Sequence, residues 1–191
     1  LIEQSFADFG DNDALLLIDT GTQHISIFLE AKARAFHQWA IADQFNRFCD
    51  GLKEGAASAS NLFTQLYYKV RMVNALRERG IKAIKEGIRF TASSSKKTIR
   101  KIGSNQVVLR AIERLARHLD ATFYVALVPD SPANVATFFD GPLTSGKPLE
   151  CPGWDVSHYG YVCWSEIHAL CAKYRLQGPS DVFAFNGKQI Y

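Results

Sequence analysis

The chain has 191 residues, of which 47% are hydrophobic and 21% are charged, and its formal net charge is +3. This apolar content excludes an intrinsically disordered chain, and the length is enough for one domain with its own core. The net charge alone does not indicate a nucleic-acid partner, and no apolar run is long enough to cross a membrane. We expect a single domain over residues 1–191 and allow for a longer chain, because the sequence does not begin with methionine.

Two apolar segments near the start of the chain predict adjacent β-strands over residues 14–19 and 24–31. The residues between them include Gly21 and Thr22, which suit a two-residue turn. With that turn, the residue before Gly21 faces the residue after Thr22, and the pairing continues outward one residue at a time on each strand. Both faces of the hairpin are largely apolar, which predicts a sheet covered on both sides.

The remaining elements alternate between helical and extended patterns. Ser60 and Ser104 are candidate N-caps, and Gly80 is a candidate helix stop. The order predicts an α/β fold, with a mixed central sheet that contains the β-hairpin and is flanked by helices. The predicted elements are helices over 35–50, 61–79, 105–119 and 165–174, strands over 121–129 and 159–164, and a terminal hairpin around Asn186 and Gly187.

Charged residues gather at one end of the predicted hairpin. The pairing places Asp13 opposite Glu30, and two adjacent carboxylates repel each other unless a cation lies between them. Lys32 lies on the same face as Glu30, because side chains of a strand alternate between two faces. Two carboxylates suit Mg²⁺, and an ammonium group can orient or deprotonate a water or stabilise a phosphate. Asp19 is a rival, but it pairs beside the turn, roughly 20 Å from Glu30.

These residues resemble a known family. Asn-Asp at 12–13, a hairpin and Glu-Ala-Lys at 30–32 are similar to the signature of the PD-(D/E)xK nuclease superfamily, with Asn12 where proline is usual. The resemblance implies a restriction-endonuclease-like fold and an endonuclease that uses Mg²⁺ or Mn²⁺ to hydrolyse phosphodiester bonds, with DNA as the expected substrate. It implies that Asp13, Glu30 and the Ala31 carbonyl hold the metal, and that Lys32 positions or activates the attacking water.

The resemblance also implies a polar side chain that faces the site from a following helix. Gln65 borders the apolar stripe of the predicted helix 61–79, and Lys69 interrupts it. We expect Gln65 to belong to the site and Lys69 to contact nucleic acid. The alternative is a glutamine at the edge of the stripe and a lysine whose amine reaches solvent.

Basic residues are concentrated in residues 81–103, which the net charge of the whole chain conceals. This segment can form a phosphate-binding arm, or it can be a solvated loop. We expect it to contact DNA through Lys96, Lys97, Arg100 and Lys101.

Other features of the sequence support weaker alternatives. Several cysteines and histidines between Cys151 and Cys171 invite a zinc site, but their spacing matches no ligand pattern. The four cysteines show no paired spacing, which favours reduced thiols and a cytoplasmic location. The alternative functions are an inactive nucleic-acid-binding or assembly domain of the same fold, and a protein-interaction domain that uses the aromatic C-terminal third. We also allow for a homodimer.

Overall fold

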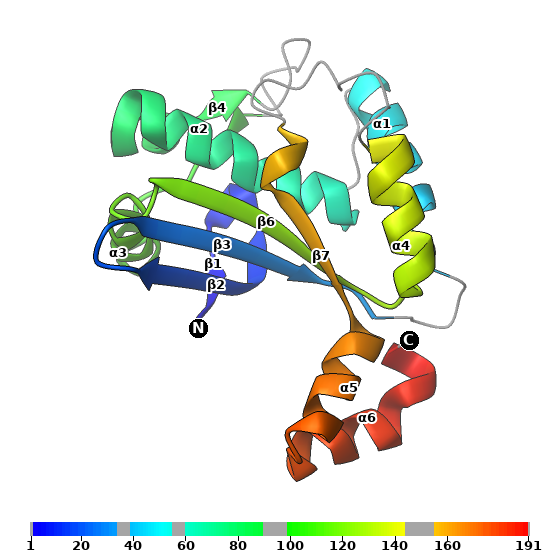
Figure 1. Cartoon of the computed structure of the whole chain (residues 1–191). Helices are drawn as coiled ribbons and strands as arrows, with labels where there is room; N and C mark the ends of the chain where they lie inside the picture. The colour runs from blue at the N-terminus through cyan, green and yellow to red at the C-terminus, as the bar shows by residue number, and fades with distance from the viewer. Residues whose placement is uncertain (1, 34–38, 55–59, 90–98, 144–154, 191) are drawn as a thin grey trace.

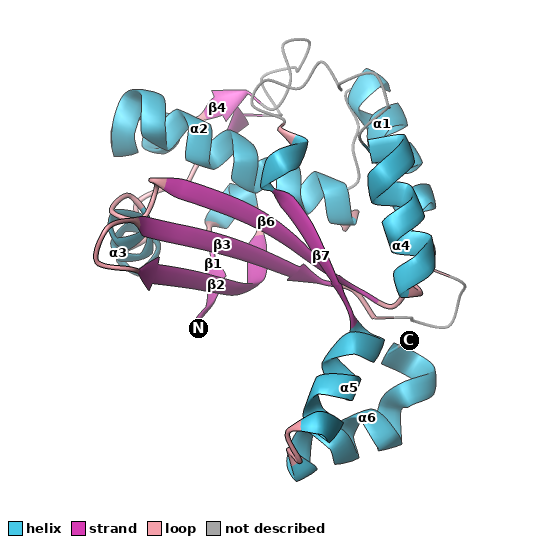
Figure 2. Ribbon diagram, viewed as in Figure 1, coloured by secondary structure: helices cyan, strands magenta, loops and turns pink. Residues whose placement is uncertain are grey.

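The fold is a mixed five-stranded sheet flanked by helices, which confirms the predicted α/β class and the mixed sheet (Figure 1). Figure 2 shows the strands as one layer with most of the helices gathered beside it. The computed structural model describes residues 2–33, 39–54, 60–89, 99–143 and 155–190.

The central sheet has the strand order β1-β2-β3-β6-β7. Strands β1, β2 and β3 pair antiparallel, whereas β3, β6 and β7 pair parallel. Two short antiparallel strands form a second sheet. The strands are β1 (Ile2–Ser5), β2 (Asp11–Asp19), β3 (His24–Ala31), β4 (Ile88–Arg89), β5 (Ile99–Arg100), β6 (Ala121–Val128) and β7 (Tyr159–Cys163).

The register of the β2–β3 hairpin is the one that the sequence predicts. Leu15 pairs with Phe28, and Asp19 pairs with His24. The turn is centred on Gly21, whose φ of 81° suits a residue without a side chain. The N–H of Gly21 donates to a carboxylate oxygen of Asp19 at 2.7 Å, which stabilises the turn.

The described helices follow the predicted order, but several of their boundaries differ. The N-cap of α2 is Asn61 rather than Ser60, and the N-cap of α3 is Asn105 rather than Ser104. In each case an asparagine side chain, one residue later, accepts the free N–H groups of the first turn. The helices are α1 (Ile41–Glu54), α2 (Leu62–Glu86), α3 (Gln106–Leu115), α4 (Pro132–Phe138), α5 (Trp164–Lys173) and α6 (Gln177–Ile190), with short 3₁₀ or π turns at Ala7–Phe9, Phe139–Leu143 and Val156–His158.

One predicted helix start is wrong, and one predicted helix stop is a break within a longer helix. The predicted helix over 35–50 is observed as α1, which begins at Ile41. Residues 39 and 40 are not helical, and residues 34–38 lie outside the described part of the chain. Gly80 interrupts α2 at the predicted stop: it takes a non-helical conformation, with φ of 71° and ψ of −173°, and a second helical segment continues to Glu86. A glycine with positive φ bends the chain there, and the residues after it resume the helix.

The predicted C-terminal hairpin is also wrong, because the chain forms helix α6 there. Figure 1 shows α5 and α6 as a helical pair at the end of β7. Phe183 is buried between the two helices, with its ring 6.0 Å from Trp164 and stacked at 5.0 Å on His168. This packing outweighs the turn preference of the Asn186-Gly187 pair.

The main hydrophobic core lies between one face of the sheet and the helices. Leu15 and Phe28 project from this face, and the ring of Phe28 stacks on that of Tyr124 at 5.7 Å. Helix α2 lies along the sheet (Figure 1), and its residue Tyr67 is buried in the same cluster. The core therefore fixes α2 against the hairpin.

The opposite face of the sheet is apolar but is not covered by the described helices. Its large side chains are half-buried, and none of them belongs to the main hydrophobic cluster. The prediction of a sheet covered on both sides is therefore wrong for the part of the chain that the structure describes. The side chains concerned are Leu16, Ile18, Ile25, Ile27, Leu29, Phe123 and Val125.

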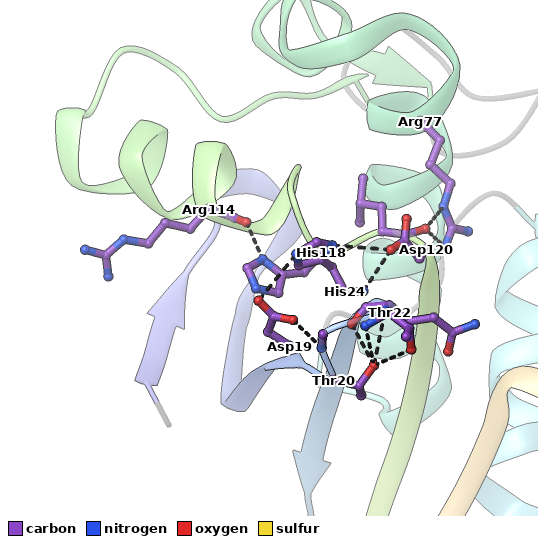
Figure 3. A network of polar contacts seen from close by, with 11 residues as sticks. Asp19, Thr20, Thr22, His24, Arg77, Arg114, His118 and Asp120 are labelled. Atoms are coloured by element: carbon purple, nitrogen blue, oxygen red, sulfur yellow. Dashed lines mark hydrogen bonds and ion pairs between the residues drawn. The ribbon is translucent and has the colours of Figure 1, made fainter.

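Polar contacts connect the hairpin turn to the start of β6 (Figure 3). The imidazole of His24 lies 3.5 Å from the Asp19 carboxylate and 3.4 Å from that of Asp120. The backbone N–H of His24 also donates to Asp120 at 2.8 Å. Its ring meets that of His118 edge to face at 5.5 Å. These contacts fix the turn end of the hairpin, opposite the end that carries Glu30.

None of the helices in the described ranges combines the length and the apolar character needed to span a bilayer.

Candidate functional site

The carboxylate of Asp13 is held at the open end of the hairpin by the next strand. Its Oδ2 accepts the backbone N–H of Ala31 at 2.6 Å. The observed strand pairing ends at Ala14 and Leu29. Side-chain alternation beyond this pair puts Asp13 on the face of Leu15 and Glu30 on the face of Phe28, which is the face that packs on the helices. The two acids therefore lie at the same end of the hairpin and on the same face of it.

Glu30 is buried, with 4% of its surface exposed, although it is an acid. Burial raises the pKa of its carboxyl group, and the negative charge of Asp13 raises it further. The charge and hydrogen bond of Lys32, and the charge of Lys69, act in the opposite direction. A carboxylate that is costly to bury and has a second carboxylate nearby is a suitable site for a cation.

Lys32 and Gln65 complete the polar cluster. The Nζ of Lys32 donates to Glu30 Oε1 at 3.0 Å and to Gln65 Oε1. Gln65 comes from the first turns of α2, so the helix and the strand β3 meet at this amine. The structure therefore brings Asp13, Glu30, Lys32 and Gln65 together, as the sequence predicts.

The backbone of Lys32 is fixed from two further sides, which no pattern in the sequence indicates. Its N–H donates to the carbonyl of Leu127 at 2.8 Å, and its carbonyl accepts the indole N–H of Trp164 at 2.7 Å. Trp164 begins α5, which directly follows β7. A tryptophan at the junction of a strand and a helix was visible in the sequence, but its partner depends on tertiary contacts.

Lys69 does not lie on the surface, so the prediction that it contacts nucleic acid is wrong. Only 1% of its surface is exposed. Its amine donates to the backbone carbonyls of Phe9 at 2.7 Å, Gly10 at 2.9 Å and Asp11 at 2.8 Å. Three donors and three acceptors leave the amine no hydrogen for a phosphate.

The other predicted DNA contacts have different outcomes. The guanidinium group of Arg100 donates to the carbonyl of Asp8 at 3.1 Å and to the hydroxyl of Tyr68 at 2.8 Å, and lies 4.5 Å from the Tyr68 ring centre. Arg100 therefore has an internal structural role. Lys101 is exposed and stays a predicted contact. The remaining two, Lys96 and Lys97, lie outside the described residues.

The rival acid Asp19 lies at the turn, where its carboxylate contacts Gly21 and His24. The zinc interpretation has no support in the described ranges: no group of three or more His, Cys, Asp or Glu side chains there could hold a metal ion. Cys151 lies outside these ranges. The same finding applies to the open end of the hairpin: within the described ranges, Asp13 and Glu30 do not belong to such a group of three either, so a cation held there would rely on two carboxylates.

The donor chemistry of this cluster fits Mg²⁺ or Mn²⁺. Among the described contacts, Asp13 uses Oδ2 for Ala31 and Glu30 uses Oε1 for Lys32. The second oxygen of each carboxylate is left for a cation. Mg²⁺ commonly takes only one or two carboxylates and keeps several waters, so two such oxygens are sufficient.

Comparison of the chain with protein-family models, curated proteins and solved structures finds no match. The chemistry of the site therefore rests on its own residues.

Proposed function

We propose that this chain is a metal-dependent nuclease of the PD-(D/E)xK type, with a restriction-endonuclease-like fold, which hydrolyses phosphodiester bonds in DNA. The observation that carries the proposal is the convergence of Asp13, Glu30, Lys32 and Gln65 at one end of the hairpin. Two carboxylates and an ammonium group supply the charges that phosphodiester hydrolysis requires.

Asp13 and Glu30 are the proposed metal ligands, with the Ala31 carbonyl as a third oxygen donor. Bound Mg²⁺ would supply a Lewis acid that offsets the negative charge of the phosphate and makes a water molecule more acidic. The raised pKa of Glu30 makes this carboxyl group sensitive to the presence of a cation.

Lys32 is the proposed partner of the attacking water. Two of its three N–H bonds donate to Glu30 and Gln65, which holds the amine in one orientation. The third N–H can donate to the water or to a phosphate oxygen. In its charged form the amine orients the water and stabilises the negative charge that builds on the phosphate as the ester bond breaks.

A second candidate function is an inactive DNA-binding or assembly domain of the same fold. The observation in its favour is that each charged side chain of the cluster already has one hydrogen-bond partner within the protein, through Ala31, Lys32 and Gln65. A cluster of this kind is stable without a metal, and a fold alone does not establish a reaction.

The deciding experiment incubates the protein with supercoiled and linear DNA, in EDTA, in Mg²⁺ and in Mn²⁺. We expect cleavage only with metal, and we expect Asp13→Asn and Lys32→Met each to abolish it. Asp19→Asn is the matched control, because it removes a carboxylate from the other end of the same hairpin and is expected to cleave normally.

The two candidate functions differ in metal uptake, which calorimetry with Mn²⁺ measures. Binding that is lost in Glu30→Gln and kept in Asp19→Asn supports the nuclease. Salt-sensitive DNA binding without metal uptake supports the inactive domain. Normal cleavage by Asp13→Asn or Lys32→Met would reject the assigned roles.

A further inference from the structure

Lys69 is a buried lysine, and the proposed reaction does not use it. Its ammonium group lies in the core and donates to three consecutive backbone carbonyls, those of Phe9, Gly10 and Asp11. Burying a lysine is costly, and here the cost lowers its pKa to about 8. An apolar side chain of similar size would fill the same volume without this cost.

The three carbonyls belong to the segment that leads into the site. Asp11 is the first residue of β2, and Asp13 is two residues further along the same strand. The preceding turn is compact, with the N–H of Phe6 bonded to the carbonyl of Gly10 at 3.2 Å. Lys69 therefore fixes the start of β2 immediately before the carboxylate of Asp13.

The position of Lys69 on α2 connects the two strands of the site. Residues four apart lie on the same side of a helix, so Gln65 and Lys69 are neighbours. Gln65 accepts from Lys32, which follows β3, and Lys69 donates to the start of β2. One side of a single helix thus contacts both strands that carry the acids.

Electrostatic attraction also holds the amine of Lys69 beside the site. The charges of Glu30, Asp11 and Asp13 each favour the protonated form of Lys69, which means that its ammonium group attracts all three. Its positive charge reciprocally lowers the cost of ionising Glu30. The amine therefore acts on both the backbone and the charge of the site.

We propose that Lys69 is a positioning residue, which fixes the backbone at Phe9–Asp11 and thereby holds the Asp13 carboxylate against the Ala31 amide, opposite Glu30. The proposal deepens the proposed function and rests on it for the role of Asp13. A purely structural lysine would instead stabilise the whole fold without a particular effect on Asp13.

Amide hydrogen exchange, measured by NMR in EDTA, separates these two roles. The N–H of Ala31 donates to Asp13, whereas the N–H of Lys32 donates to Leu127 and does not involve Asp13. In Lys69→Met we expect the Ala31 amide to exchange about tenfold faster relative to the Lys32 amide, since a hydrogen bond to a charged group is lost.

Val73→Ala is the matched control, because Val73 is fully buried one turn further along α2. It lowers global stability, so we expect it to accelerate both amides together. An equal acceleration of both amides in Lys69→Met would overturn the proposal. Failure of both Lys69→Met and Lys69→Ala to fold would also overturn it, since Lys69 would then serve the whole fold.

Chemical rescue gives a second readout. Lys69→Ala leaves a space for a small cation, so added methylammonium is expected to restore the slow exchange of the Ala31 amide, and added methanol is not. Neither readout uses metal or DNA. A wild-type protein that cleaves nothing would therefore reject the proposed function and leave the role of Lys69 to be decided by exchange alone.

Discussion

The carboxylate of Asp13 accepts the backbone N–H of Ala31 at 2.6 Å, so the acid of one strand is fixed by the end of the next. Ala31 directly follows Glu30 in the sequence, so this bond brings Asp13 beside Glu30. The carboxylate of Glu30 itself accepts from Lys32. A cation shared by the two acids would therefore lie at a junction that the backbone already defines. Asp13 is exposed and Glu30 is buried, so the two acids respond differently to substitution.

Replacing Glu30 with glutamine should abolish Mn²⁺ binding without destabilising the metal-free protein. The pKa of Glu30 is raised mainly by burial, so the folded state favours its neutral form, which glutamine imitates. We expect the free energy of unfolding in EDTA near pH 7 to be equal to or above that of wild type.

The same pKa shift makes the difference in stability between the wild type and Glu30→Gln depend on pH. From the unfolded value of 4.5 up to the raised folded value, the native protein binds more protons, so wild-type stability falls relative to Glu30→Gln as pH rises. Urea unfolding across this window measures the difference. A Glu30→Gln protein that is much less stable than wild type throughout would contradict the assigned cause of the shift.

The stability of the wild type should rise relative to Lys69→Met between about pH 8 and the unfolded lysine value of 10.5. The pKa of Lys69 is lowered by burial, so in this window the unfolded chain binds more protons than the folded one. The gain in the stability of the wild type relative to Lys69→Met is at most about 3 kcal/mol. Urea unfolding of both proteins near pH 7 and near pH 10 measures it, and the other lysines cancel in the comparison.

Replacing Trp164 with phenylalanine removes the indole N–H that donates to the Lys32 carbonyl. We expect a loss of about 1 kcal/mol in the free energy of unfolding and a fall of roughly tenfold in cleavage rate, because the strand end moves. Trp39→Phe is the control, since Trp39 packs against the core. Equal cleavage rates for the two variants would show that the bond to Lys32 does not affect the reaction.

The two faces of the sheet should tolerate truncation differently. Phe28→Ala removes a fully buried ring and should cost about 3–5 kcal/mol of unfolding free energy. Ile27→Ala, on the half-buried face, should cost less than about 2 kcal/mol. Thermal or urea unfolding of residues 1–191 measures both. Equal costs would mean that the face of Ile27 is covered as tightly as the core.

The sequence by itself determined the hairpin and the acids at its end. Side-chain alternation and one glycine turn were enough, because strand pairing across a short turn depends on local geometry alone. The register of Leu15 with Phe28 follows from it, and side-chain alternation then puts Asp13 and Glu30 on the same face. The α/β class could be predicted for a similar reason, since the order of strands and helices appears in the hydrophobic pattern.

Only the tertiary structure decided the surroundings of these acids. Lys69 has the same place on its helix whether its amine reaches solvent or bonds to Phe9–Asp11, and periodicity cannot distinguish the two. Trp164 meets Lys32 across 132 residues of sequence, a contact that no local pattern encodes. The C-terminal helix formed against a turn signal, because burial of Phe183 depends on where α5 lies. Burial and desolvation by residues distant in sequence thus decided the surroundings of these side chains and the form of the C-terminal segment, which local propensity does not determine.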